Sequence, residues 1–201
     1  MKRGPWTIQA SRTAYENPWV RVEHDDVTRA DGKAGVYGVV RFANVAVGVL
    51  PLFDDGTVPL VGQHRYPFDA YSWELPEGGA PLAEDPEEAA RRELAEETGL
   101  RAGHLAELGR AHLSNSVTDE RAVMYLAWGL DQGRAAPGGD EVLEHRRVPF
   151  ADLLDACLSG EITDAFTHLM TLTAWARAQR HELPATPTAL ILGPATRSDR
   201  S

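Results

Sequence analysis

The sequence predicts an α/β or α+β fold, because strand patterns fill its first part and strands alternate with helices afterwards. Three features support this prediction: a strand-rich stretch at residues 1–44, a nearly continuous apolar run at 45–52 (VAVGVLPL), and a strong helical segment at 86–98. An uninterrupted apolar run is typical of a strand that is covered on both faces. We therefore expect a central strand that is buried on both sides.

Residues 1–44 predict a small antiparallel β subdomain. Apolar residues alternate around Val20 and Val22, and a second strand pattern follows at residues 36–42. The segment Ala30-Asp31-Gly32-Lys33 between them is a turn signal. A small sheet of this kind is marginally stable alone, so we expect it to pack against something else.

After the central run, Asp54-Asp55-Gly56 is a turn signal, and we expect residues 57–66 to form the hairpin partner of residues 45–52. Residues 71–75 are a short strand pattern.

The helical segment has clear signals at both ends. Asp85 is a good N-cap residue, Pro86 suits the first helical position, and Gly99 suits the left-handed residue that ends a helix. Its interior is rich in Ala, Glu, Leu and Arg, which are strong helix formers.

The last part of the chain alternates between the two kinds of element. Strands are expected at residues 104–114, 122–130 and 142–148, and helices at 150–158 and 163–180. Residues 183–201 are rich in turn-forming residues, and we expect a poorly ordered tail there.

The composition excludes several classes of protein. With 20 Lys and Arg against 30 Asp and Glu, the formal net charge is −10, which repels nucleic acid. The single cysteine, Cys157, excludes an internal disulfide framework and is typical of a reducing compartment. The sequence contains neither an apolar signal segment nor an apolar run of membrane-spanning length. We therefore expect a cytoplasmic protein without a nucleic-acid or membrane partner.

Three glutamates of the predicted helix, Glu93, Glu96 and Glu97, fall within about a third of its circumference. Most glutamate-rich helix faces are simply solvated, and the helix alone leaves that interpretation open. A cluster of carboxylate oxygens also suits Mg²⁺ or Mn²⁺, which keep water molecules that a phosphate can replace.

The spacing around these glutamates is specific. From Gly78 to Leu100 the chain follows the pattern Gly-x5-Glu-x7-Arg-Glu-Leu-x-Glu-Glu-x-Gly-Leu. This segment resembles the signature of the Nudix hydrolases at every defined position. The resemblance implies an α/β/α sandwich with a mixed sheet. It also implies attack of water on a pyrophosphate bond, assisted by Mg²⁺, with Mn²⁺ as a possible substitute.

The resemblance also assigns roles to residues. It implies that Glu93, Glu96, Glu97 and the backbone carbonyl of Glu77 bind the metal. It implies an ion pair between Arg92 and Glu84 that braces the loop on the helix, so Arg92 would support catalysis by positioning the glutamates. Gly78 and Gly99 are structural positions of the same signature.

Three further segments resemble the ADP-ribose pyrophosphatase and nucleotide-sugar branch of that family: Gln63-His64-Arg65-Tyr66, Trp73–Gly78 (WELPEG, similar to ELPAG), and Gly160–Ala165 (GEITDA), which is followed by Phe166 in place of the usual lysine. In this branch an N-terminal strand subdomain usually builds a homodimer. We accordingly expect an N-terminal β subdomain at residues 1–44, involved in dimerisation and contacts to the base, and a Nudix domain at 45–182.

The predicted substrate-binding residues are Arg65, Arg41, Trp19 and Glu74. Arg65 is the best candidate for a phosphate contact, because a planar guanidinium matches phosphate oxygens; a surface arginine after a strand is the alternative. Trp19 and Tyr37 suit stacking on a base, and packing in a core or interface explains them equally well.

The segment from Ser114 to Glu120 is expected to carry one more catalytic acid. In this branch the corresponding loop often holds a base or an additional metal ligand, and Thr118-Asp119-Glu120 fits that pattern. Glu120 is the first choice and Asp119 the second, while a solvated turn acid is the alternative. Asn115 stands where the ADP-ribose enzymes usually have proline, which leaves the substrate open.

The whole sequence predicts a metal-dependent hydrolase of a nucleoside diphosphate linked to another group. Hydrolysis of ADP-ribose to AMP and ribose 5-phosphate is the first choice, and another nucleotide sugar or FAD is the alternative. The alternative from another class of function is a Nudix fold retained as a non-catalytic ligand-sensing module. The presence of all signature glutamates favours the enzyme.

Overall fold

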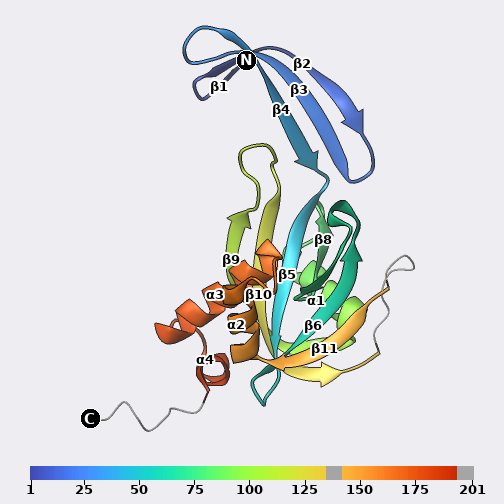
Figure 1. Ribbon diagram of the computed structural model, residues 1–201, viewed down its shortest axis with the longest axis vertical. Coiled ribbons are helices and arrows are strands. Elements are labelled where there is room, and N and C mark those ends of the chain that lie inside the picture. Colours follow the sequence, from blue (N-terminus) through green and yellow to red (C-terminus); the bar gives the residue numbers. More distant parts are fainter. Residues whose placement is uncertain (135–141, 194–201) are drawn as a thin grey trace.

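Three sheets organise the computed structural model, which describes residues 1–134 and 142–193. The first sheet is antiparallel in the order β1-β2-β3-β4, with strands Lys2–Arg3, Trp6–Glu16, Val20–Thr28 and Ala34–Phe42. It stands at one end of the long axis of the molecule (Figure 1). The antiparallel N-terminal sheet was predicted, although the longest of its strands, β2, was not recognised separately.

The central sheet is mixed and has the order β8-β5-β10-β9. Strand β5 (Asn44–Leu52) runs parallel to β10 (Arg121–Gln132) and antiparallel to β8 (Glu77–Pro81), and β9 (Leu100–His112) is antiparallel to β10. Helix α1 (Pro86–Thr98) covers one face, and α2 (Phe150–Ser159) and α3 (Ala165–Gln179) cover the other (Figure 1). The α/β/α sandwich implied by the sequence is thereby confirmed.

Strand β5 explains the continuous apolar run. Val47 and Val49 join a cluster with Leu94 of α1, whereas Leu50 and Leu52 join the second cluster, with residues of α2 and α3. Because successive strand residues point to opposite faces, a strand between two helical layers needs apolar residues at every position. Each fully buried aliphatic side chain contributes about 1.5–3 kcal/mol to stability.

The third sheet has the order β11-β6-β7, with strands Glu144–Pro149, Thr57–Arg65 and Ala70–Glu74, and the short 3₁₀-helix η1 (Tyr66–Phe68) joins β6 to β7. The predicted hairpin between residues 45–52 and 57–66 is therefore wrong. The turn at Gly56 is formed, with φ at 77°, but both edges of β5 are occupied by β8 and β10. Strand β6 consequently starts a sheet of its own.

Part of the expected disordered tail is a helix. Helix α4 (Ala185–Leu192) begins after Pro184, and the Thr188 hydroxyl donates to the carbonyl of Pro184 at 2.9 Å. Ile191 is only 7% exposed and packs into the main core, which holds the segment in place. The expectation of disorder for residues 183–201 was thus wrong for α4, and residues 194–201 lie outside the described chain.

The loop between β9 and β10 fastens the N-terminal sheet to the rest of the molecule. The amide of Val40 donates to the carbonyl of Val117 at 2.9 Å, and the amide of Asp119 donates to the carbonyl of Val40 at 3.1 Å. The Tyr37 hydroxyl donates to the carbonyl of Ser116 at 2.6 Å. The sheet therefore lies directly against the loop that ends in Glu120.

Across residues 1–134 and 142–193, the helices are all too short or too polar to cross a bilayer.

Candidate active site

Local sequence signals shape helix α1 and the segment before it, residues 75–85, which includes strand β8 and which we call the signature loop. The carboxylate of Asp85 accepts from the amides of Glu87 at 2.8 Å and Glu88 at 3.3 Å, which satisfies two of the amides left open at a helix N-terminus. Gly99 ends the helix with φ at 74°, a conformation that favours glycine. Both predicted ends of the helix are confirmed.

Arg92 connects the loop to the helix. Its guanidinium donates to Glu84 at 3.0 Å and to the carbonyl of Gly79 at 3.1 Å on the loop, and to Glu93 at 2.8 Å and Glu96 at 3.1 Å on the helix. The expected ion pair with Glu84 is formed, and this hydrogen bond is the main cause that raises the pKa of Arg92. A planar five-donor side chain suits such a junction.

Gly78 brings the loop close to the helix. A Cβ atom on Gly78 would lie 2.1 Å from the carboxyl carbon of Glu93, so any other residue at this position would displace the Glu93 carboxylate. One residue earlier, the amide of Glu77 donates to the carboxylate of Glu97 at 3.1 Å, and Glu97 is only 4% exposed. The loop therefore rests directly on two of the three predicted metal ligands. The third, Glu96, is 43% exposed.

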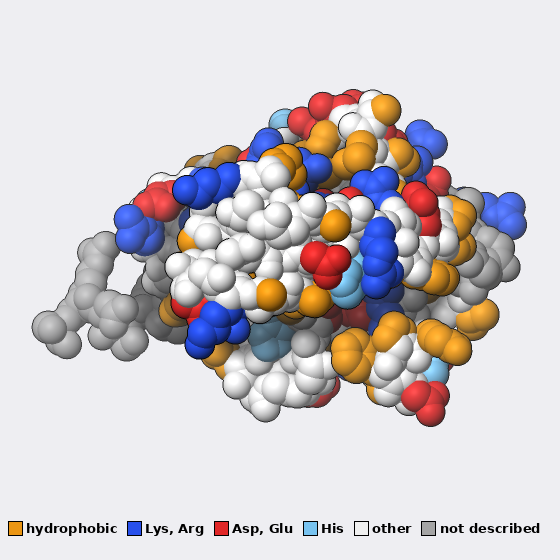
Figure 2. Space-filling view, turned by 90° about the horizontal axis from the view of Figure 1, so that it is seen from above, with side chains coloured by type: hydrophobic (Ala, Val, Ile, Leu, Met, Phe, Trp, Pro, Cys, Tyr) orange, Lys and Arg blue, Asp and Glu red, His pale blue; other side chains and the backbone are white. Residues whose placement is uncertain are grey.

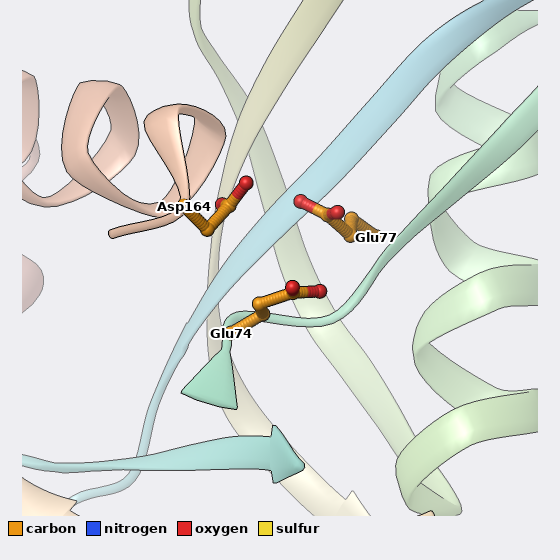
Figure 3. Close-up of side chains that lie close together, drawn as sticks. All are labelled: Glu74, Glu77 and Asp164. Carbon is orange, nitrogen blue, oxygen red and sulfur yellow. The ribbon is translucent and has the colours of Figure 1, made fainter. Parts of the chain in front are cut away.

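A second group of carboxylates lies beside this loop. Glu74 from β7, Glu77 from β8 and Asp164 at the N-terminus of α3 place ligand oxygens within 4.8 Å of one another. Figure 3 shows the three side chains pointing toward a common space from three separate elements. We call Glu74, Glu77 and Asp164 the inner acidic cluster.

Arg65 neutralises part of this cluster. Its Nε donates to the two oxygens of Glu74 at 2.9 and 3.1 Å, and its Nη2 donates to Glu74 and, at 2.7 Å, to Glu77. The hydrogen bond to Glu74 is the main cause that raises the pKa of Arg65. Burial raises the pKa of Glu77 well above its ordinary value, and the charges of Asp164 and Glu74 raise it further. One carboxylate of the cluster is therefore easily protonated.

The structure brings the predicted site residues together in two groups. In the described part of the chain, the inner acidic cluster is the one group of three or more potential ligands whose oxygens converge this closely. The helix carboxylates Glu93, Glu96 and Glu97 are instead held by Arg92 and by the signature loop. Arg65 and Glu74, predicted separately as substrate-binding residues, are bound to each other.

Two acidic groups were missed by the sequence analysis: the side chain of Glu77, of which only the carbonyl was considered, and Asp164. A signal existed for each of them. Glu77 occupies the alanine position of the ELPAG segment, and Asp164 lies in the GEITDA segment, where its carboxylate also accepts from the amide of Thr167 at 2.6 Å. The residues around Glu77 and Asp164 in the sequence do not predict that either acid lies beside Glu74.

The N-terminal sheet contributes Arg41, which lies on β4. Its guanidinium donates to Glu23 at 2.8 Å and to Asp119 at 3.3 Å, and the hydrogen bond to Glu23 is the main cause that raises its pKa. The other oxygen of Asp119 accepts from the amide of Phe42 at 2.9 Å. Asp119 is thus engaged in holding the sheet against the loop.

Glu120 is in a different situation from Asp119. Within the described residues, its half-buried carboxylate makes no hydrogen bond or ion pair, and burial raises its pKa. Trp19, the remaining predicted substrate contact, lies in the turn between β2 and β3 with 66% of its surface exposed.

Comparison with known proteins identifies the family. A family profile described as the NUDIX domain matches residues 43–168, which is more than half of the chain. The chain belongs to the Nudix family. A second profile, the nucleoside diphosphate sugar hydrolase N-terminal domain, matches residues 6–40 of this Nudix protein.

Relatives and a solved structure agree with this result. The chain is 34% identical over 145 residues to an ADP-ribose pyrophosphatase of Bacillus subtilis, covering 71% of this chain and 78% of the relative. It is 34% identical over 159 residues to an ADP-ribose pyrophosphatase of Mycobacterium tuberculosis, covering 78% and 76%. A crystal structure of an ADP compounds hydrolase superposes with a TM-score of 0.75 at 25% identity, covering 87% of this chain and 95% of that one. The protein is a Nudix hydrolase.

Proposed function

We propose that this Nudix hydrolase cuts the pyrophosphate bond of a nucleoside diphosphate linked to another group, with ADP-ribose, cut to AMP and ribose 5-phosphate, as the leading substrate. The observation that carries the proposal is the contact of the signature loop with the helix carboxylates at Gly78 and Glu93. The substrate class rests on the two relatives named as ADP-ribose pyrophosphatases and on the N-terminal profile.

The donor set fits a hard divalent cation. Glu93, Glu96, Glu97 and the carbonyl of Glu77 offer only oxygen ligands, which Mg²⁺ prefers and Mn²⁺ also accepts. We assign the ion to these groups. When bound there, it would neutralise charge on the leaving oxygen and lower the pKa of the attacking water. Arg92 holds Glu93 and Glu96 in position, so its role is to orient ligands.

Glu120 is assigned as the proton acceptor for the attacking water. Both oxygens of Asp119 are engaged by Arg41 and Phe42, whereas the Glu120 carboxylate has no such partner among the described residues. Its raised pKa makes it a stronger base than an exposed glutamate, which suits proton transfer near neutral pH.

Arg65 is assigned to a substrate phosphate, and Arg41 remains a proposed substrate contact. The Nε and Nη2 of Arg65 face the inner acidic cluster, and the side chain is 36% exposed, so we assign its Nη1 to a phosphate oxygen. Glu74 is 3% exposed and bound to Arg65, which suits a residue that orients the guanidinium.

We also propose that the protein forms a homodimer through its N-terminal sheet. Tyr15, Trp19 and Val36 of this part of the chain are 58%, 66% and 60% exposed. Seen from the N-terminal end, Figure 2 shows hydrophobic side chains exposed in several groups among acidic and basic side chains. A second copy would cover such groups and could bring Trp19 to a base. A mass of one chain in light scattering at micromolar concentration would contradict this.

The test of the function is product release with Mg²⁺ across ADP-ribose, GDP-mannose, UDP-glucose, FAD and nucleoside triphosphates, with Glu97→Gln as the control. We expect turnover to be highest on ADP-ribose and to vanish in the control. If turnover is highest on another diphosphate, the proposed substrate is wrong but the proposed reaction stands. Equal, control-level signals on all substrates would contradict the enzyme and favour a ligand-sensing module.

A further inference from the structure

The C-terminal end of α1 is held by groups from two other strands. The last carbonyls of a helix have no partner within the helix, so they need donors from outside it. The carbonyls of residues 97–99 accept, in that order, from Nε2 of His145 at 2.6 Å, from the side-chain amide of Gln132 at 3.2 Å and from the amide of Gly133 at 2.7 Å. The end of β10 and the start of β11 therefore close this helix.

His145 makes the contact that bears on a predicted metal ligand. It is exposed, follows the first residue of β11 and is 48 residues away from Glu97 in the sequence. Because a carbonyl oxygen can only accept, Nε2 of His145 carries the hydrogen in this contact. The last turn of α1 contains no basic residue of its own, so His145 supplies a donor that the helix lacks.

This end of the helix carries two of the proposed ligands. Glu96 and Glu97 lie in the last turn of α1, which ends at Thr98. Helix ends fray, and a turn that opens displaces the carboxylates that it carries. The carboxylate of Glu97 accepts from the amide of Glu77 at 3.1 Å, and its carbonyl accepts from His145. Glu97 is therefore held at its side chain and at its backbone.

We propose that His145 is a positioning residue of the metal site, because its hydrogen bond to the carbonyl of Glu97 keeps the last turn of α1 in the geometry in which Glu96 and Glu97 bind the ion. This inference rests on the proposed function, which assigns the ion to the helix carboxylates. His145 acts through the backbone. Groups that orient ligands in this way usually contribute about 10–100-fold to metal affinity.

Two substitutions separate the hydrogen bond from the rest of the side chain. The amide nitrogen of glutamine is as many bonds from Cα as Nε2 of histidine, whereas that of asparagine is one bond closer. His145→Gln can therefore still donate to the carbonyl of Glu97, and His145→Asn cannot reach it. Electron paramagnetic resonance of Mn²⁺, titrated into the full-length protein, measures the affinity of each. We expect Mn²⁺ to bind at least about tenfold more weakly to His145→Asn and within about threefold of the parent to His145→Gln.

Chemical denaturation with and without Mn²⁺ distinguishes positioning from a purely structural role. An ion that binds only the folded protein raises the free energy of unfolding, and the rise depends on its affinity. We expect a smaller rise in His145→Asn than in the parent. If His145→Asn lowers the free energy of unfolding by the same amount with and without Mn²⁺, the role is only structural and the proposal is overturned.

Gln132→Ala is the matched control, because it removes the hydrogen bond to the next carbonyl, that of Thr98. The Thr98 hydroxyl donates to the carbonyl of Leu94 at 2.5 Å and accepts from the amide of Leu100 at 3.1 Å, so Thr98 keeps anchors of its own. We expect Gln132→Ala to bind Mn²⁺ within about threefold of the parent. If it weakens binding as much as His145→Asn does, the helix end is loosened in general, and the assignment to His145 is overturned.

Glu97→Gln separates failure of this inference from failure of the proposed function. If Glu97→Gln weakens Mn²⁺ binding and His145→Asn does not, His145 has no positioning role and the proposed metal site stands. If Glu97→Gln binds Mn²⁺ as the parent does, the metal site itself is wrong, and the role of His145 is wrong with it. His145→Ala takes the place of His145→Asn in every comparison if His145→Asn does not fold.

Discussion

The helix carboxylates and the inner acidic cluster meet at Glu77 but handle their charge differently. The amide of Glu77 donates to Glu97, whereas its side chain belongs to the cluster. Each group has its own arginine, and Arg92 and Arg65 are similarly exposed, at 35% and 36%. The helix partners of Arg92, Glu93 and Glu96, are 15% and 43% exposed, whereas the partners of Arg65, Glu74 and Glu77, are 3% and 16% exposed.

This difference indicates a division of work between the two groups. Exposed carboxylates keep most of their hydration and can exchange an arginine for a cation, whereas buried ones depend on their partner. The exposed Glu96 can therefore exchange Arg92 for a cation, and we place the metal there, with the less exposed Glu93 and Glu97 as its further ligands on the helix. We regard the inner acidic cluster, with Arg65, as the group that positions the substrate phosphates.

Loss of a helix carboxylate should have the largest effect. Glu97→Gln keeps a group that can accept from the amide of Glu77 but removes the charge. We expect kcat to fall by at least about 100-fold, which is more than the loss usually seen when a residue that only orients a metal ligand is replaced. In the matched variant Asp164→Asn, kcat should fall by less than about tenfold. A larger loss in Asp164→Asn would move the metal to the inner cluster.

Removal of Arg65 should affect stability more than removal of Arg92. In Arg65→Gln the carboxylates of Glu74 and Glu77 lose their partner, and we expect the free energy of unfolding to fall by about 2–3 kcal/mol. This is less than the roughly 3–5 kcal/mol for a fully buried pair, since Arg65 is partly exposed. Chemical denaturation measures the free energy of unfolding of Arg65→Gln and Arg92→Gln. An equal or larger decrease in Arg92→Gln would contradict the expected order.

Arg92→Lys should lower activity with little change in stability. A lysine ammonium cannot serve Glu84, Glu93 and Glu96 at once with the geometry of a guanidinium. We expect kcat/KM to fall by about 10–100-fold, the usual range for a group that orients ligands. Steady-state kinetics at saturating Mg²⁺ checks this, and activity within about twofold of the parent would show that the brace is dispensable.

The pH dependence of stability should reveal the raised pKa of Glu77. Since this pKa lies above its ordinary value of 4.5, the folded protein holds a proton that the unfolded chain has released. The free energy of unfolding therefore falls as the pH rises from 4.5 to the folded pKa, and levels off above it. Denaturation in EDTA should show a flatter profile for Glu77→Gln, and an unchanged slope would place the effect elsewhere.

The parts of the site that depend on local sequence were predictable. The N-cap Asp85, the C-terminal Gly99 and the spacing of Glu93, Glu96 and Glu97 all follow from contacts within one helix and its loop. The burial of β5 on both faces was also visible, because it leaves a run of apolar residues in the sequence.

The parts that arise from long-range packing were not predictable. Asp164 meets Glu74 and Glu77 only because α3 begins beside β7 and β8, and no periodicity in the sequence carries that information. The pairing of β6 with β7 and β11 depends on which strands occupy the edges of β5. Helix α4 depends on a tertiary contact of Ile191, which a short segment cannot reveal.

Electron paramagnetic resonance of Mn²⁺ bound to the parent protein, Glu97→Gln and Asp164→Asn shows most directly which carboxylates hold the ion. If the helix carboxylates hold the ion, Glu97→Gln weakens binding by at least about tenfold and Asp164→Asn stays near the parent. Weakened binding in Asp164→Asn together with parent-like binding in Glu97→Gln would contradict the account and assign the ion to the inner acidic cluster.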